Sequence, residues 1–159
     1  MVVCIFEPST LRAVREDPFS TPYFMWLDGG YGHGNHGVLP HTGVWKPRNL
    51  LEFPNQVTFI HLMDKQPEEF RDVKDRLPKM HISILAGLFF GAGREVFKEL
   101  YAMQVEEVER WLEEGIVDDD QTMYMMLYFR KPELFRWVRS NWYGVFDVFQ
   151  TNPTRHEKY

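Results

Sequence analysis

Four short apolar runs, separated by polar or helix-forming segments, constrain the fold of this chain more than any other feature. The runs are VVCIF, PYFMWLD, QVTFIHLM and HISILAGLFF, which start at residues 2, 22, 56 and 81. Each has the length and the β-branched or aromatic content of a buried strand. Strands that alternate with helices predict an α/β fold, with a mixed and mostly parallel sheet flanked by helices.

The clearest helix pattern follows the fourth run. It starts after Gly93, and Gly115 is its predicted C-terminal cap. Its apolar side chains recur at the spacing of one helix face. They are Phe97, Leu100, Tyr101, Val105, Val108, Trp111 and Leu112.

The other segments are less regular. A short helix is predicted to end at Pro18, and a further helix is predicted to end before Pro132. Glycines and prolines make residues 29–56 a long loop with room for a short helix. Residues 65–77 predict a polar helical or irregular surface segment, and residues 134–149 predict the end of a helix followed by a strand.

Composition excludes several classes of protein. With 159 residues, 44% of them hydrophobic, the chain is long and apolar enough for one folded domain, predicted over 1–150 with a polar tail at 151–159. A net charge of −5 does not favour nucleic-acid binding. No apolar run reaches the roughly 20 residues that span a bilayer. The single cysteine, Cys4, excludes an internal disulfide, and we expect a cytoplasmic protein unless a targeting segment is missing.

The stretch PYFMWLDGGYGHGNHG holds the first candidate site. Asp28 ends an apolar run and is followed directly by Gly29 and Gly30. A carboxylate at the end of a strand is well placed to hold Mg²⁺ or a similar hard cation. Glycines beside it would let a phosphate or sugar approach the backbone closely. The alternative is an ordinary Asp-Gly turn.

Two histidines in the same stretch, His33 and His36, are spaced as possible metal ligands. A flexible glycine lies between them and no thiolate is near, so exposed loop histidines are the preferred interpretation. The chain contains no C-x-x-C pair and no H-E-x-x-H motif.

The second candidate is the glycine-bearing segment LAGLFFGAGREVF at residues 85–97. A strand is predicted to enter a loop with Gly87, Gly91 and Gly93, and this loop opens a helix whose first N–H groups could bind an anion. The spacing matches neither the dinucleotide nor the phosphate-loop pattern. Arg94 would lie in the first helical turn, where a cation is slightly unfavourable, which predicts an anionic ligand or a carboxylate partner.

The third candidate is DDDQ at residues 118–121. Asp118 or Asp119 is expected to cap the helix that follows. Three adjacent carboxylates exceed what capping needs, so one of them could serve as a general base. Gln121 could bond to sugar hydroxyls through both ends of its amide.

These pieces, in this order, resemble the HtrL/YibB family of glycosyltransferase-like proteins. The matching segments are STPYFMWLDGG, ILAGLFFGAGREVFKELY, GIVDDDQTMYMMLYFRKPELF and NWYGVF. They extend from about residue 19 to about residue 150. The resemblance implies a GT-A-like fold and transfer of a sugar from a nucleotide-sugar donor to a hydroxyl of a glycan or protein.

The resemblance also implies roles for particular residues. Asp28 takes the place of the metal-binding acid of a D-x-D motif, with Mn²⁺ or Mg²⁺ as its cation. Gly87 and the loop through Gly93 would line the donor and acceptor cleft. Asp120 with Gln121, beside Asp119, would face the acceptor or the sugar as the catalytic group.

One position departs from the family pattern. Gly30 stands where a D-x-D motif has its second acid, so the alternative is a non-catalytic binding module of the same fold. Family members have an upstream strand-and-helix region, and we therefore expect a short or N-terminally truncated member. The sequence leaves the sugar, the acceptor and the oligomeric state open.

Overall fold

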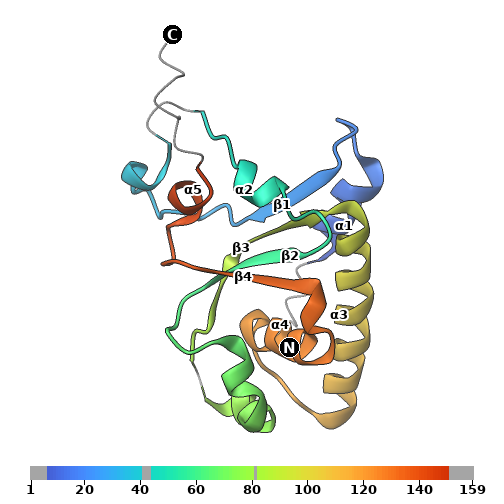
Figure 1. The fold of residues 1–159 in the computed structure, drawn as a ribbon. Coiled ribbons are helices and arrows are strands. Elements are labelled where there is room, and N and C mark those ends of the chain that lie inside the picture. Colours follow the sequence, from blue (N-terminus) through green and yellow to red (C-terminus); the bar gives the residue numbers. More distant parts are fainter. Residues whose placement is uncertain (1–6, 41–43, 81, 151–159) are drawn as a thin grey trace.

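The centre of the protein is a four-stranded sheet with the order β1-β3-β2-β4 (Figure 1). The computed structural model describes residues 7–40, 44–80 and 82–150. The strands are β1 (Tyr23–Leu27), β2 (Val57–His61), β3 (Leu85–Gly93) and β4 (Phe135–Arg139). Strand β3 runs antiparallel to both β1 and β2, and β2 pairs in parallel with β4.

The predicted α/β fold with a mixed sheet is confirmed, but the prediction of a mostly parallel sheet is wrong. Only the β2–β4 pairing is parallel among the described strands. A buried apolar run indicates that a strand is present but not whether it runs parallel or antiparallel to its neighbours, because a strand buried on both faces has the same side-chain pattern in both cases. The direction of β3 matters here, because it brings the start of β3 to the end of β1.

Helices cover both faces of this sheet. The helices are α1 (Glu7–Glu16), α2 (Arg48–Leu51), α3 (Arg94–Glu114), α4 (Asp120–Arg130) and α5 (Val145–Val148), with 3₁₀ segments η1 (His36–Val38), η2 (Pro67–Lys79) and η3 (Pro132–Leu134). Gly115 ends α3 with φ +68°, as predicted for a left-handed cap. None of the described helices is long and apolar enough to cross a membrane.

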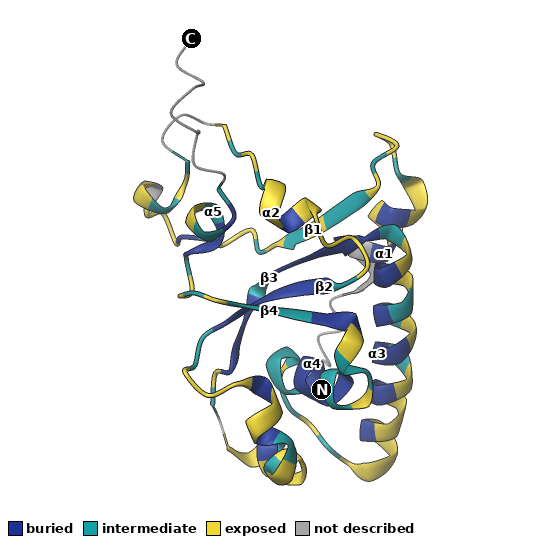
Figure 2. Ribbon diagram, viewed as in Figure 1, coloured by how far each residue is buried: buried dark blue, intermediate teal, exposed yellow. Residues whose placement is uncertain are grey.

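The sheet separates two hydrophobic cores. The larger core lies under α3 and α4 and includes Phe59, Phe90 and Tyr124. The smaller core lies under α2 and α5 and includes Leu50 and Phe89. Figure 2 shows the two inner strands, β2 and β3, almost wholly buried between these layers. Leu112, predicted on the apolar face of α3, is instead 54% exposed.

The C-terminal segment differs from its prediction. A strand, β4, comes first at Phe135, and the short helix α5 follows it, whereas a helix end followed by a strand was expected for residues 134–149. Helix α4 ends just before Pro132, and the short segment η3 then leads directly into β4. The predicted strand at 2–6 and the tail at 151–159 lie outside the described residues.

Candidate functional site

The C-terminal end of β1 lies against the first half of β3, because the two strands are antiparallel. Leu27 pairs with Phe89. The next residue, Asp28, donates its backbone N–H to the carbonyl of Leu88 at 2.9 Å. Asp28 is thereby fixed beside Gly87, although 59 positions separate the two in the chain.

Strand β3 is irregular at this point. Its pairing with β2 steps from Phe90 opposite Phe59 to Leu85 opposite His61. Strand β3 therefore contains extra residues between these two pairs, and Gly87 is one of them. Such bulges bend a strand and redirect its side chains, and they are common beside active sites.

Asp120, the first residue of α4, lies directly against Gly87. A Cβ atom built on Gly87 would be 3.0 Å from the Asp120 Cγ and 3.3 Å from Oδ1, and would overlap Oδ2. Any larger residue at this position would therefore displace the carboxylate. Because Gly87 has no side chain, the Asp120 carboxylate occupies the space that a side chain would fill.

The surroundings of Asp120 favour its protonated form. The pKa of Asp120 is raised to about 6, first by burial and then by the negative charges of Asp119 and, more weakly, Asp28. Hydrogen bonds from the backbone N–H groups of Asp120 and Gln121 oppose the rise. The charge of Asp28, although remote from Asp120 in the sequence, thus adds to the rise in the pKa of Asp120.

The remaining residues of the acidic run have distinct positions. Asp119 is the cap of α4, and its Oδ1 accepts a hydrogen bond from the Thr122 backbone N–H at 3.0 Å. This confirms the capping prediction for Asp119. Asp118 Oδ2 and Gln121 Oε1 are buried and have no hydrogen-bond partner in the described part of the chain. Both are acceptors, so a donor such as a hydroxyl would satisfy them.

Asp28 also forms an Asp-Gly turn, which was the alternative prediction for this residue. Its Oδ1 accepts the Gly30 N–H at 2.6 Å, and its backbone carbonyl accepts the Tyr31 N–H at 3.0 Å. Gly29 is exposed, and a Cβ atom there would meet nothing within 4 Å. The turn leaves Oδ2 of Asp28 as the oxygen outside this hydrogen bond.

Two predicted glycines lie away from these carboxylates. Residues 87–93 form one continuous strand and not the predicted loop. Gly93 pairs with Tyr23 at the opposite end of β1 from Asp28, and it packs against the carbonyl of Pro54. Gly91 packs against the side chains of Tyr23 and Met25. The prediction that the cleft extends to Gly91 and Gly93 is therefore not supported by their positions.

Arg94 has a carboxylate partner, which was one of its two predicted environments. Its guanidinium pairs with Asp17 and donates to the carbonyl of Val14 at 3.3 Å. It also lies over the Phe24 ring, 5.6 Å from the centroid. Arg94 joins α3 to the end of α1, on the side of the sheet where β1 begins, and not to the carboxylate pair.

The described residues do not form a complete cation site. They contain no group of three or more histidine, cysteine or acidic side chains that could hold a metal. His33 is exposed in the turn after Asp28, as expected, and the side chain of His36 lies outside the described residues. Two carboxylates fit a cation that takes its other oxygen ligands from phosphate and water, as Mg²⁺ often does, and do not form a complete cage.

Comparisons with known proteins place the chain in a family. The model of the family described as "Bacterial protein of unknown function (HtrL_YibB)" matches residues 2–151. The chain belongs to the HtrL/YibB family. It is 27% identical over 148 residues to Protein HtrL of Escherichia coli (strain K12), and the match covers 89% of this chain and 49% of that protein. This HtrL/YibB chain thus spans about half the length of its curated relative. No solved structure matches it.

One contributor to the site in this HtrL/YibB chain gave no signal in the sequence. The carbonyl of Leu88 holds Asp28 in place, but a backbone contact carries no side-chain pattern. The closeness of Gly87 to Asp120 could be inferred only from the family resemblance. By contrast, the turn at Asp28 and the cap at Asp119 are local, and their residue types indicated them directly.

Replacing Gly87 by alanine tests the geometry around Asp120. We expect Gly87→Ala to fold with a change in unfolding free energy within about 1 kcal/mol, because the flexible carboxylate can turn aside. Ligand binding or activity that depends on Asp120 should fall as far as in Asp120→Asn. Denaturation and binding measurements check both parts. Gly29→Ala is the matched control for the denaturation measurement, since a Cβ atom there meets open space. Unchanged binding in Gly87→Ala, beside a loss in Asp120→Asn, would contradict the prediction.

Proposed function

We propose that this HtrL/YibB chain is a glycosyltransferase that transfers a sugar from a nucleotide-sugar donor to a hydroxyl, with the help of a divalent cation. One observation carries the proposal. The Asp120 carboxylate fills the space beside Gly87, the Asp28 backbone is bonded to the neighbouring Leu88, and the charge of Asp28 contributes to the raised pKa of Asp120. Sugar transfer needs a group that accepts the hydroxyl proton and groups that neutralise the leaving diphosphate, and a carboxylate pair can contribute to both.

Asp120 is the proposed general base. Its pKa of about 6 suits proton transfer near neutral pH, since it is mostly ionised at pH 7 yet more basic than an ordinary aspartate. It would accept the proton of the attacking hydroxyl. The unpartnered oxygens of Asp118 and Gln121 are suited to accept hydrogen bonds from neighbouring hydroxyls of the same sugar once it binds.

Asp28 is the proposed ligand of a divalent cation that arrives with the donor. When bound, such a cation stabilises negative charge on the leaving diphosphate. Asp28 would present one carboxylate oxygen to this cation. The hydrogen bond that the Gly30 N–H donates to Oδ1 fixes the orientation of the carboxylate. The donor phosphates would complete the oxygen ligands that these carboxylates do not provide.

Calorimetry with UDP- and GDP-sugars, with and without Mn²⁺, tests the proposal as a whole. Binding of a nucleotide-sugar together with release of free nucleotide in the presence of an acceptor is the expected result. Absence of binding to all of these donors at millimolar concentration would overturn the enzyme proposal.

The cation assignment has its own test. Mn²⁺ together with UDP at about ten times the dissociation constant should raise the melting temperature by roughly 3–6 °C. Asp28→Asn should remove most of this rise, because the carboxylate oxygen becomes a neutral amide. Asp72→Asn, an exposed carboxylate on η2, serves as the control and should keep it. An unchanged rise in Asp28→Asn would move the cation to the 118–120 cluster.

The second candidate is a binding module of the same fold without catalysis. It is favoured by the shortage of cation ligands among the described residues. Such a module would bind the sugar or nucleotide without turnover. Saturable binding with no nucleotide release over many hours would favour it over the enzyme.

A further inference from the structure

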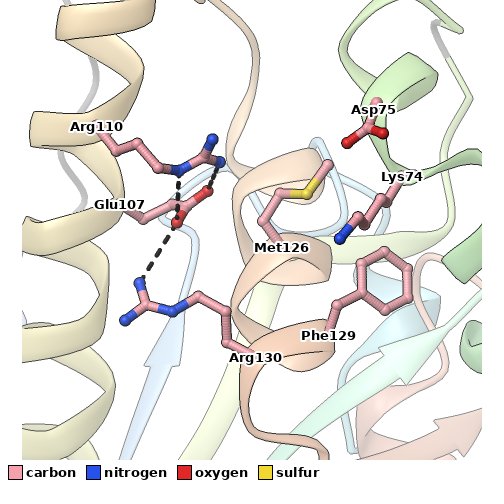
Figure 3. Close-up of a pocket in the computed structure, with 7 residues that line it drawn as sticks. All are labelled: Lys74, Asp75, Glu107, Arg110, Met126, Phe129 and Arg130. Atoms are coloured by element: carbon pink, nitrogen blue, oxygen red, sulfur yellow. Dashed lines mark hydrogen bonds and ion pairs between the residues drawn. The ribbon is translucent and has the colours of Figure 1, made fainter.

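The side chain of His33 has few contacts of its own to explain its position. The arginines of α3 and α4 provide the contrast, because the buried Glu107 accepts hydrogen bonds from both Arg110 and Arg130 (Figure 3). The imidazole of His33 is exposed, and among the residues that the structure describes it forms no hydrogen bond and no ion pair. Its ring nitrogens are therefore open to a ligand.

The backbone at His33 has a conformation that favours glycine. Its φ is +43°, and its neighbours on both sides, Gly32 and Gly34, have φ +81°. A residue with a side chain is strained in this region, and such strain is concentrated at functional sites. The chain thus has a histidine where a third glycine would fit the backbone better.

Two other non-glycine residues of the described chain share this left-handed region. The side chain of Asp17, with φ +33°, is used within the fold, where it accepts the Thr21 N–H at 2.8 Å and pairs with Arg94. Ser20, with φ +53°, lies in an exposed turn before β1. A positive φ therefore does not indicate function by itself, and the position of His33 has to decide.

The imidazole of His33 borders the same small space as the carboxylate of Asp28. A Cβ atom built on Gly30 would be 3.1 Å from Asp28 Oδ1 and 4.0 Å from His33 Cε1. A side chain at position 30 would therefore come between the two groups. Gly30, which departs from the D-x-D pattern, leaves a space with a carboxylate on one side and an imidazole on the other.

The ring of His33 is held in this place by the turn at residues 141–144. The centroid of the ring is 6.4 Å from that of Tyr143, and the two rings meet edge to face. Tyr143 also meets Tyr31 edge to face at 5.8 Å, and the Tyr31 hydroxyl accepts the Val145 N–H at 3.3 Å. A contact through the ring positions the imidazole without using a hydrogen bond of its nitrogens.

We propose that His33 is a further binding residue of this site, whose imidazole N–H donates a hydrogen bond to the diphosphate of the nucleotide-sugar donor. The inference rests on the proposed function, since the cation at Asp28 would bring the diphosphate to this space. Phosphate oxygens accept hydrogen bonds, and a bond to a charged group contributes more than one between neutral groups. His33 would thus bind the phosphate, and Asp28 the cation.

Calorimetry with UDP and Mn²⁺ measures the contribution of His33. His33→Asn should weaken the binding of UDP roughly tenfold, because asparagine tolerates the left-handed backbone and lacks the imidazole. His33→Gly should weaken it as much and should raise the melting temperature by about 1–3 °C, since it relieves the strain. Both losses should be the same with Mg²⁺. A loss confined to Mn²⁺ would make the imidazole a ligand of the cation and overturn the inference.

Ser20→Gly is the matched control, because it removes the other exposed side chain with a positive φ, at the opposite end of β1 from Asp28. It should also raise the melting temperature and should leave the affinity for UDP unchanged. Unchanged binding of UDP in both His33 variants would overturn this inference and leave the donor proposal standing. Absence of UDP binding by the natural protein would overturn both.

Discussion

Substitution of Asp120 by asparagine is expected to slow sugar transfer by about 10²–10⁴-fold and to stabilise the protein above pH 7. The loss of rate follows because asparagine cannot accept a proton, and a general base contributes about this factor. The gain in stability follows because ionising this half-buried carboxylate opposes folding. A residue retained at a cost in stability is better explained by function than by packing.

The direction of the pH effect follows from the raised pKa. The carboxyl of Asp120 has a pKa of about 6 in the folded chain, against 3.8 for the ordinary value. Between these values the folded chain keeps the proton that the unfolded chain has lost, so the free energy of unfolding falls as pH rises. The full shift would correspond to about 3 kcal/mol, and partial exposure reduces this to roughly 1–2 kcal/mol.

Urea denaturation in EDTA at pH 4 and pH 8 measures this effect. Asp120→Asn should exceed the natural protein by about 1–2 kcal/mol at pH 8 and should match it at pH 4. Asp119→Ala is the control from the same run of acids. It should lower stability by roughly 0.5–2 kcal/mol, because it removes the cap of α4. If Asp120→Asn were less stable than the natural protein at pH 8, the carboxylate would be structural and the base assignment would lose its support.

Local patterns in the sequence predicted local structure well. The cap at Asp119, the left-handed glycine at 115 and the turn at Asp28 each involve neighbours within four residues, where the residue type decides the backbone geometry. Three of the four predicted apolar runs contain the strands β1, β2 and β3, because apolar runs of this length have few other uses.

The order and the directions of those strands in the sheet could not be predicted from the sequence. Whether Gly87 or Gly93 lies near Asp28 depends on the direction of β3, which the apolar pattern does not contain. The family resemblance supplied the association of Asp28, Gly87 and Asp120, and the antiparallel pairing excludes Gly93 from it. Glu107 was missed although it gave a signal. It occupies the apolar face of α3, between Met103 and Trp111 at helical spacing, where an acid requires a partner.

Replacing Glu107 by alanine should destabilise the protein by about 1–3 kcal/mol, a substantial part of the roughly 5–15 kcal/mol that holds most domains folded. The substitution leaves the arginines Arg110 and Arg130 facing each other without the buried carboxylate. It also leaves the indole N–H of Trp111, which donates to Glu107 at 2.9 Å, without its acceptor. Urea denaturation at pH 7 measures the loss.

Two exposed acids provide matched controls, because they pair with the same two arginines. Glu114 accepts from Arg110 at 2.9 Å, and Glu106 accepts from Arg130 at 2.6 Å. Their side chains are 48% and 63% exposed, so each alanine substitution should cost only about 0–1 kcal/mol, and 0.5 M NaCl should reduce even that. The loss in Glu107→Ala should persist in salt, since the solvent does not reach this carboxylate. Equal losses for the three variants would mean that Glu107 contributes as a surface charge and does not join α3 to α4.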